Sequence, residues 1–173
     1  MASYYYLISS LPMLKADEAM PFSYGTFLEM CRPCVSESTY GRLEELTVGS
    51  DKGPLMAEWA AFYGALASEL TYQRNQRLGR PCEAPAERDE KTMRTVTAAL
   101  NAKNPLEAEI LLLSLEFDRL DELVSMHFFD DHVLNGYALK LKLLERQTIF
   151  DKAGGKTEFK RLLDHVQQQI LSI

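Results

Sequence analysis

The stretch from Asn104 to Val124 constrains the fold of this chain more than any other part of the sequence. Asn104 is a good N-cap residue, Pro105 suits the first helical position, and Glu107 and Glu109 favour the positive end of a helix dipole. Apolar residues then recur at alternating spacings of four and three: Leu106, Ile110, Leu113, Phe117, Leu120 and Val124. This spacing is typical of a seam between packed helices and predicts a helix of about five turns.

A second long helix is predicted after Pro54, which suits a helix start. Two adjacent apolar stripes follow, one of Leu55, Trp59, Phe62, Leu66 and Leu70, the other of Met56, Ala60, Tyr63 and Ala67. Residues 79–85 contain one glycine and two prolines, which break the helix and form a connector. Residues 87–100 are charged and only weakly amphipathic, so we predict an exposed helix there.

The C-terminal part predicts two more helices. Asp130 or Asp131 is positioned to cap a helix from about His132 to Lys152, which stops at Gly154-Gly155. A last helix from about Lys156 is predicted to bury Phe159, Leu162, Leu163, Val166 and Ile170.

The N-terminal part is made of shorter segments. Residues 4–11 are apolar and aromatic and end at Pro12, which fits either a buried strand or a helix. Ser23 is positioned to cap a short helix, and a second short helix is predicted from Ser36 to Leu46. Turn-forming residues 48–54 follow. The chain is therefore predicted to form a single all-α domain over residues 1–173, an antiparallel bundle of long amphipathic helices. A subdivision into a small N-terminal part, 1–50, and a long-helix bundle, 51–173, remains an alternative.

Composition limits the class of partner. The 173 residues carry a formal net charge of -6, which argues against nucleic-acid binding because phosphate recognition needs clustered Lys and Arg. The longest apolar run, Ile110 to Leu115, is far shorter than the roughly 20 residues that cross a bilayer. The N-terminus does not resemble a signal peptide, and three cysteines suit a reducing compartment. We therefore expect a cytoplasmic protein whose partners are other proteins.

Charge is unevenly distributed between two of the predicted helices. Acidic residues concentrate on the helix after Asn104, and Lys140, Lys142 and Arg146 make the next helix basic. We favour complementary flanks of an antiparallel helix pair over an electrostatic docking surface. The residues that would form an interface are the N-terminal tyrosines and these charges: Tyr4, Tyr5, Tyr6, Glu109, Glu116, Asp118, Asp121, Glu122, Lys140, Lys142 and Arg146.

Cys31-Arg32-Pro33-Cys34 is the sharpest chemical motif, because a Cys-x-x-Cys pair at a helix N-terminus supports disulfide exchange. Here the motif closes a short helical pattern and no strand precedes it, so we favour two ordinary thiols. A thiol-redox or metal-binding protein built on Cys31 and Cys34 remains an alternative. Zinc would need Cys82 or a histidine as further ligands, and none has the spacing of a structural zinc site.

Two other motifs are candidate sites. His127 and His132 enclose two aspartates and are a metal candidate, but a capping turn at the surface is the favoured interpretation. Gly154-Gly155-Lys156-Thr157 resembles the end of a phosphate-binding loop, yet Phe150 replaces the upstream glycine. Because no nucleophile elbow is present either, we predict no catalytic, cofactor-binding or metal-binding residues, and thus a protein that is not an enzyme.

Four segments carry a resemblance to a known family: Tyr4 to Pro12, Asn104 to Glu109, Phe117 to Leu123 and Tyr137 to Arg146. The chain resembles a bacterial family encoded among V-type ATP synthase genes. Members of this family look like stand-ins for the C component of the central stalk, whose eukaryotic counterpart is called the d component. The likeness is weaker between about residues 49 and 94.

The resemblance implies a fold and a role. The stalk C component is an all-helical, non-enzymatic adaptor between the central shaft and the membrane rotor ring of this proton- or sodium-transporting complex. A similar role here would be docking to the shaft and ring, with membrane association only through these partners. The full C component is longer and has three similar lobes, whereas this chain contains no internal repeat. A generic helical interaction module is the remaining alternative.

Overall fold

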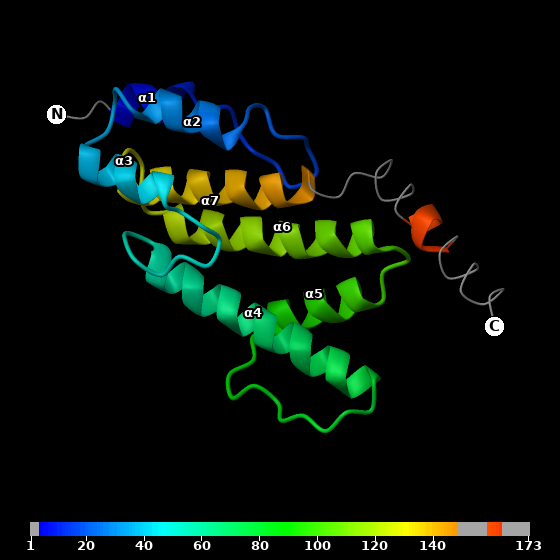
Figure 1. Ribbon diagram of the computed structural model, residues 1–173. Helices are drawn as coiled ribbons and strands as arrows, with labels where there is room; N and C mark the ends of the chain where they lie inside the picture. The colour runs from blue at the N-terminus through cyan, green and yellow to red at the C-terminus, as the bar shows by residue number, and fades with distance from the viewer. Residues whose placement is uncertain (1–3, 149–158, 164–173) are drawn as a thin grey trace.

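The computed structural model describes residues 4–148 and 159–163, and this part of the chain contains helices, turns and loops but no strand (Figure 1). The fold is all-α, as the sequence predicts. Residues 4–10 form a helix, which decides the question that periodicity left open. The main helices are α1 (Tyr4–Ser10), α2 (Tyr24–Cys31), α3 (Glu37–Glu44), α4 (Met56–Arg77), α5 (Glu90–Leu100), α6 (Pro105–Val124) and α7 (Asp131–Thr148).

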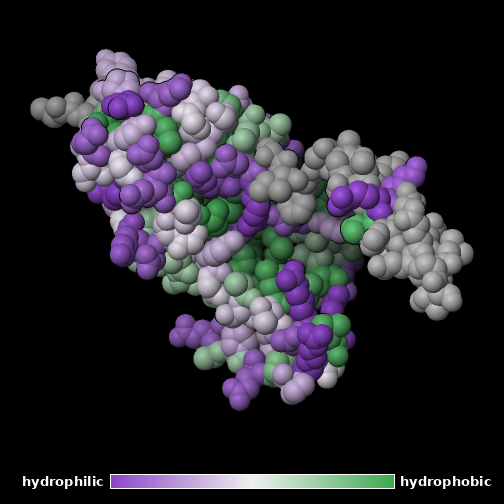
Figure 2. All heavy atoms as spheres, viewed as in Figure 1, coloured by the Kyte–Doolittle hydropathy of each residue, from purple (hydrophilic) through white to green (hydrophobic). Residues whose placement is uncertain are grey.

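The helices are arranged around an antiparallel pair, α6 and α7 (Figure 1). The short helices α1, α2 and α3 lie on the α7 side of this pair, and α4 and α5 lie on the α6 side. In the space-filling view, hydrophilic residues cover much of the molecule, and hydrophobic residues show at the surface where α6 passes above α4 and α5 (Figure 2).

The predicted helix starts at Ser23, Ser36 and Asn104 are confirmed. Each of these side chains accepts a hydrogen bond from the backbone N–H three residues further along the chain, at 3.2, 3.2 and 2.8 Å respectively. Asp130 is the cap of α7, because its Oδ1 accepts bonds from the backbone N–H groups of His132 and Val133. Local sequence therefore fixes where these four helices begin.

The larger hydrophobic core contains residues from both sides of the loop at residues 48–54. It joins apolar residues of α1 to α3 to the start of α4 and to the facing sides of α6 and α7. Trp59 lies at its centre, fully buried, and its indole N–H donates to the Val48 carbonyl at 2.8 Å. A smaller cluster of Leu66, Val96 and Leu115 holds α4, α5 and α6 together.

Two predicted elements differ in the structure. Pro54 does not begin α4, because Leu55 adopts a left-handed φ of 71° and the helix starts at Met56. This turn buries Leu55 in the core, which offsets a backbone strain of about 1–2 kcal/mol. The prediction that residues 87–100 form an exposed, weakly amphipathic helix is also wrong: α5 buries Val96 and Ala99 between α4 and α6.

The last predicted helix is only partly described. Residues 159–163 are helical, but Phe159, Leu162 and Leu163 are exposed, so the prediction that they are buried is wrong. The predicted stop at Gly154-Gly155, the turn after it, and the predicted burial of Val166 and Ile170 lie outside the described residues.

Gly136 is required for the close packing of α6 against α7. A Cβ atom at this position would lie 2.8 Å from Cγ1 of Val124, a distance that real side chains do not tolerate. The glycine therefore lets the first turns of α7 approach the last turn of α6. This contact places the α6–α7 loop at the end of the bundle.

Candidate functional site

Exposed aromatic and methionine side chains gather at the end of the bundle where α1 begins and α6 joins α7. This aromatic end consists of Tyr5, Tyr6, Met126, Phe128 and Phe129, all of them exposed. Phe128 is 72% exposed and Tyr6 74%, values unusual for large apolar rings. A cluster of this kind marks an interaction surface more often than a feature of the free monomer.

Ring contacts join the two segments that form the aromatic end. The centroid of Tyr5 lies 4.8 Å from that of Phe129 and 5.5 Å from that of Tyr6. These separations are within the range of favourable aromatic pairs. Residues more than 120 positions apart in the chain thus form one surface.

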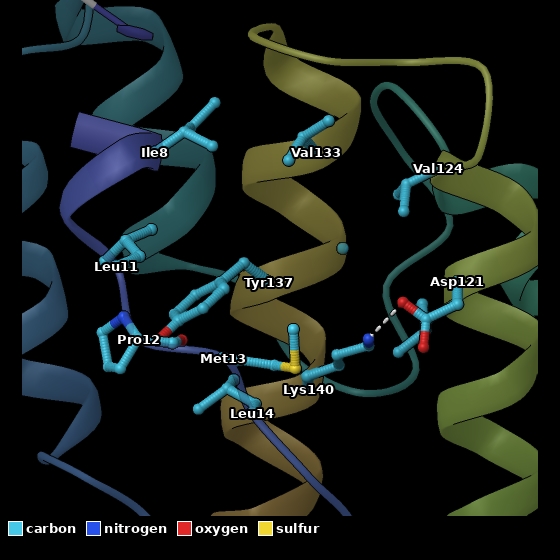
Figure 3. Close-up of a pocket in the computed structure, with 12 residues that line it drawn as sticks. Ile8, Leu11, Pro12, Met13, Leu14, Asp121, Val124, Val133, Tyr137 and Lys140 are labelled. Atoms are coloured by element: carbon cyan, nitrogen blue, oxygen red, sulfur yellow. Dashed lines mark hydrogen bonds and ion pairs between the residues drawn. The ribbon is translucent and has the colours of Figure 1, made fainter. Parts of the chain in front are cut away.

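A groove of about 300 Å³ begins one turn further along α1 and lies between α1, α6 and α7 (Figure 3). Ile8 lines it from α1, Val124 from α6 and Val133 from α7. Tyr137 closes one side and donates a hydrogen bond to the Pro12 carbonyl at 3.0 Å. The lining is mainly apolar, so the groove suits hydrophobic side chains rather than a charged ligand.

The loop that carries the aromatic end also brings three polar side chains together. Nδ1 of His127 lies 2.6 Å from Oδ2 of Asp130, and Nδ1 of His132 lies 3.9 Å from the same oxygen. The two imidazole rings stack with centroids 3.9 Å apart. Burial would raise the pKa of the Asp130 carboxyl, but the hydrogen bonds from His127 and from the Val133 backbone outweigh it and hold that pKa below its usual value.

Most of the charged residues predicted as an interface form ion pairs between neighbouring helices. Lys140 contacts Asp121 across the α6–α7 pair at 2.5 Å, as the dashed line in Figure 3 shows. Asp118 and Glu122 both contact Lys91 of α5, at 3.1 and 3.4 Å. These pairs are complementary flanks of packed helices, the interpretation that the sequence favours.

Lys142 lies with its ammonium group 3.7 Å from the centroid of the Tyr24 ring and 3.3 Å from Glu145. Of the three predicted tyrosines, Tyr5 and Tyr6 belong to the aromatic end, and Tyr4 begins α1.

Glu116 is not a surface residue, and here the sequence-based interface is wrong. Its side chain is 2% exposed, and its Oε2 lies 3.0 Å from Nη2 of the Arg146 guanidinium. Arg146 also contacts Glu109 at 2.7 Å, so one cation lies between two carboxylates. Burial raises the pKa of Glu116 to about 7, although Arg146 opposes this shift.

The cysteine pair lies at the C-terminal end of α2, not at a helix N-terminus. Cys31 is fully buried, and burial raises the pKa of its thiol to about 12. A thiol of this kind is protonated at neutral pH, and the thiolate is the reactive species. The geometry therefore gives no support to disulfide exchange at Cys31.

Sequence reasoning missed the loop residues of the aromatic end. Met126, Phe128 and Phe129 fall in a segment that reads as a turn, and a turn gives no information about which helix it faces. The signal that was available is compositional, since three large apolar residues in four positions are uncommon in a polar turn.

Comparison with known proteins adds no assignment: no family model, curated protein or solved structure matches this chain. Among the described helices, none combines the length and the apolar character that crossing a membrane requires.

Proposed function

We propose that this protein is a non-enzymatic helical adaptor that docks a partner protein through the aromatic end. The proposal rests on the exposed rings of Tyr5, Tyr6 and Phe129, which contact one another, and on exposed Phe128 beside Phe129 in the chain. Aromatic residues and methionine are enriched at the centres of protein interfaces, where they supply large contact area at a low entropy cost. The groove between α1, α6 and α7 lies next to this surface and extends the apolar area that a partner helix would cover.

The partner class follows from the family resemblance of the sequence. We propose that the protein serves as an adaptor of a V-type ATP synthase, between the central shaft and the rotor ring, in the manner of the stalk C component. Such an element must resist twisting. Three long helices, α4, α6 and α7, with 22, 20 and 18 residues, support this role because their packing spans roughly 30 Å of continuous structure.

The direct test is binding of the purified full chain to the purified shaft, a complex of the V-type ATP synthase subunits D and F, and separately to the solubilised rotor ring. Gel filtration detects a complex and titration calorimetry measures its affinity. We expect the double variant Tyr6→Ser, Phe128→Ser to lose binding by tenfold or more, about 1.4 kcal/mol. Leu78→Ser is the matched control, because Leu78 is 63% exposed and lies at the far end of α4, outside the aromatic end.

Two results would contradict different parts of the proposal. Failure of the wild-type chain to bind either the shaft or the ring would refute the stalk role and favour the generic interaction module. Binding that Tyr6→Ser, Phe128→Ser leaves unchanged would refute the aromatic end as the docking surface while keeping the partner.

A further inference from the structure

We infer that His127, Asp130 and His132 form a binding site for a divalent transition-metal ion, with zinc as the best-fitting class. Nothing in the proposed adaptor function requires this site. The sequence alone favours a capping turn with no metal, because two histidines five residues apart across a helix break do not predict a common position for their ring nitrogens. The structure brings one ligand atom from each of the three side chains within 4.8 Å of the others.

The three ligand atoms are nearly at coordination distance. A tetrahedral zinc ion with bonds of roughly 2.0–2.1 Å separates its ligand atoms by about 3.3 Å. The Nδ1 atoms of His127 and His132 lie 2.6 and 3.9 Å from Oδ2 of Asp130, one shorter and one longer than this separation. Changes of well under 1 Å bring these two separations to the required value, and the two imidazole rings, which stack at an angle of 12°, must also turn so that both ring nitrogens point at the ion. The side chains are between 32% and 44% exposed, so rotation can supply such shifts without unpacking the core.

The carboxylate is already oriented for this role. Oδ1 of Asp130 accepts the backbone N–H groups of His132 and Val133 at 3.1 and 3.2 Å, which fixes the plane of the carboxyl group. Oδ2 is thereby directed at the two imidazoles. One carboxylate oxygen thus accepts the hydrogen bonds that hold the group in place, and the other oxygen faces the ion. Metal-binding carboxylates are commonly positioned by such outer hydrogen bonds. The Asp130 charge also offsets the repulsion between a cation and the N-terminus of α7.

The Asp130 carboxylate forms a hydrogen bond with only one of the two histidines. His127 is within hydrogen-bonding distance of Oδ2, but His132 at 3.9 Å is too far for such a bond. A bound ion would accept a lone pair from each ring nitrogen and from Oδ2, and the proton of the hydrogen bond between His127 and Asp130 would be released to solvent. Two imidazoles and one carboxylate leave a fourth position for water, as in zinc sites with an open coordination position.

The test is calorimetric titration of the untagged full chain with ZnCl₂ at pH 7.5, paired with CoCl₂ absorption spectra. We expect one ion per chain and a tetrahedral cobalt spectrum without thiolate charge-transfer bands. His127→Gln and His132→Gln should each weaken binding more than about tenfold, since loss of even an outer-shell contact costs this much. His165→Gln, which removes the remaining histidine, and Cys31→Ser, Cys34→Ser are the controls that should bind normally.

Histidine ring ¹⁵N spectra give a second readout that does not depend on any variant, because coordination through Nδ1 shifts that resonance in two of the three histidines. Absence of stoichiometric binding would overturn the inference. So would binding that survives both His127→Gln and His132→Gln, or binding that disappears in the cysteine variant with thiolate bands in the cobalt spectrum. Circular dichroism of His127→Gln and His132→Gln establishes that a loss of binding is not a loss of fold.

Discussion

Replacing Glu116 with glutamine is expected to stabilise the protein at pH 8 and to leave its stability nearly unchanged at pH 4. The Glu116 carboxylate is buried on α6, where it and Glu109 share the single cation Arg146, and Tyr63 lies at the edge of the same cluster. Burial raises the pKa of Glu116 from 4.5 to about 7. At neutral pH the folded state therefore carries a charge that the unfolded chain holds more easily.

The sign of the pH dependence follows from linkage. Well below pH 4.5 the group is protonated in both states and contributes no pH dependence. As the pH rises from 4.5 to about 7, the unfolded chain loses the proton first, so the free energy of unfolding falls, and above this window it levels off. The pKa difference of about 2.5 units corresponds to about 3 kcal/mol at 1.36 kcal/mol per unit. Glutamine keeps an oxygen for Arg146 and removes the charge, so it should abolish most of this loss.

The assay is urea unfolding at several pH values, followed by the fluorescence of Trp59, the only tryptophan, which is fully buried. The quantity compared is the difference in free energy of unfolding between Glu116→Gln and wild type, since other titrating groups cancel in it. Glu90→Gln is the control, because Glu90 is an exposed residue of α5. A variant less stable than wild type at pH 8 would show that the Arg146 ion pair outweighs the desolvation of Glu116, and the reasoning would fail.

Three further predictions test the packing and the helix start. Gly136→Ala should lower the free energy of unfolding by about 1–3 kcal/mol, because the new Cβ would lie 2.8 Å from Val124 Cγ1, and a double-mutant cycle should find a smaller loss in a Val124→Ala background. Phe27→Ala should cost about 3–5 kcal/mol in urea unfolding since Phe27 is fully buried, whereas Phe128→Ala at the aromatic end should stay within about 0.5 kcal/mol of wild type. Asn104→Ala should cost about 1 kcal/mol through loss of the bond from the Glu107 N–H to its Oδ1, and Asn104→Asp should retain most of the stability in thermal melts.

The fold was predictable where the information is local. The helix starts at Ser23, Ser36 and Asn104 and the burial of Leu113, Phe117 and Leu120 depend on residues within one or two turns of each other, and the structure confirms them. Leu106, the first residue of the predicted seam, is 60% exposed, so the seam begins later than predicted. The start of α4 was not predictable, because the left-handed Leu55 results from burial against distant residues.

The candidate site was also predictable only where the information is local. Tyr5 and Tyr6 were identified because aromatic residues are conspicuous in a sequence, but their contact with Phe129 depends on how α1 docks beside the α6–α7 loop. In the sequence Glu116 is one acidic residue among several on helix α6, and its position beside the apolar seam does not show whether it is buried. Only the approach of Arg146 from α7 explains how this carboxylate lies inside the bundle.

The aromatic end and the histidine–aspartate cluster are built from one loop, and this has a thermodynamic consequence. Phe128 and Phe129 lie between His127 and Asp130 in the chain, so an ion that fixes those two ligands also restricts the two rings. If both proposals hold, we expect zinc to change the affinity of the chain for its protein partner, and by linkage the partner changes the affinity for zinc by the same factor. Titrating the partner with and without ZnCl₂, and zinc with and without the partner, measures both factors independently. If the two factors are equal and differ from one, zinc binding and partner binding are coupled through this loop. If both factors are one, the loop holds its rings in place without the metal.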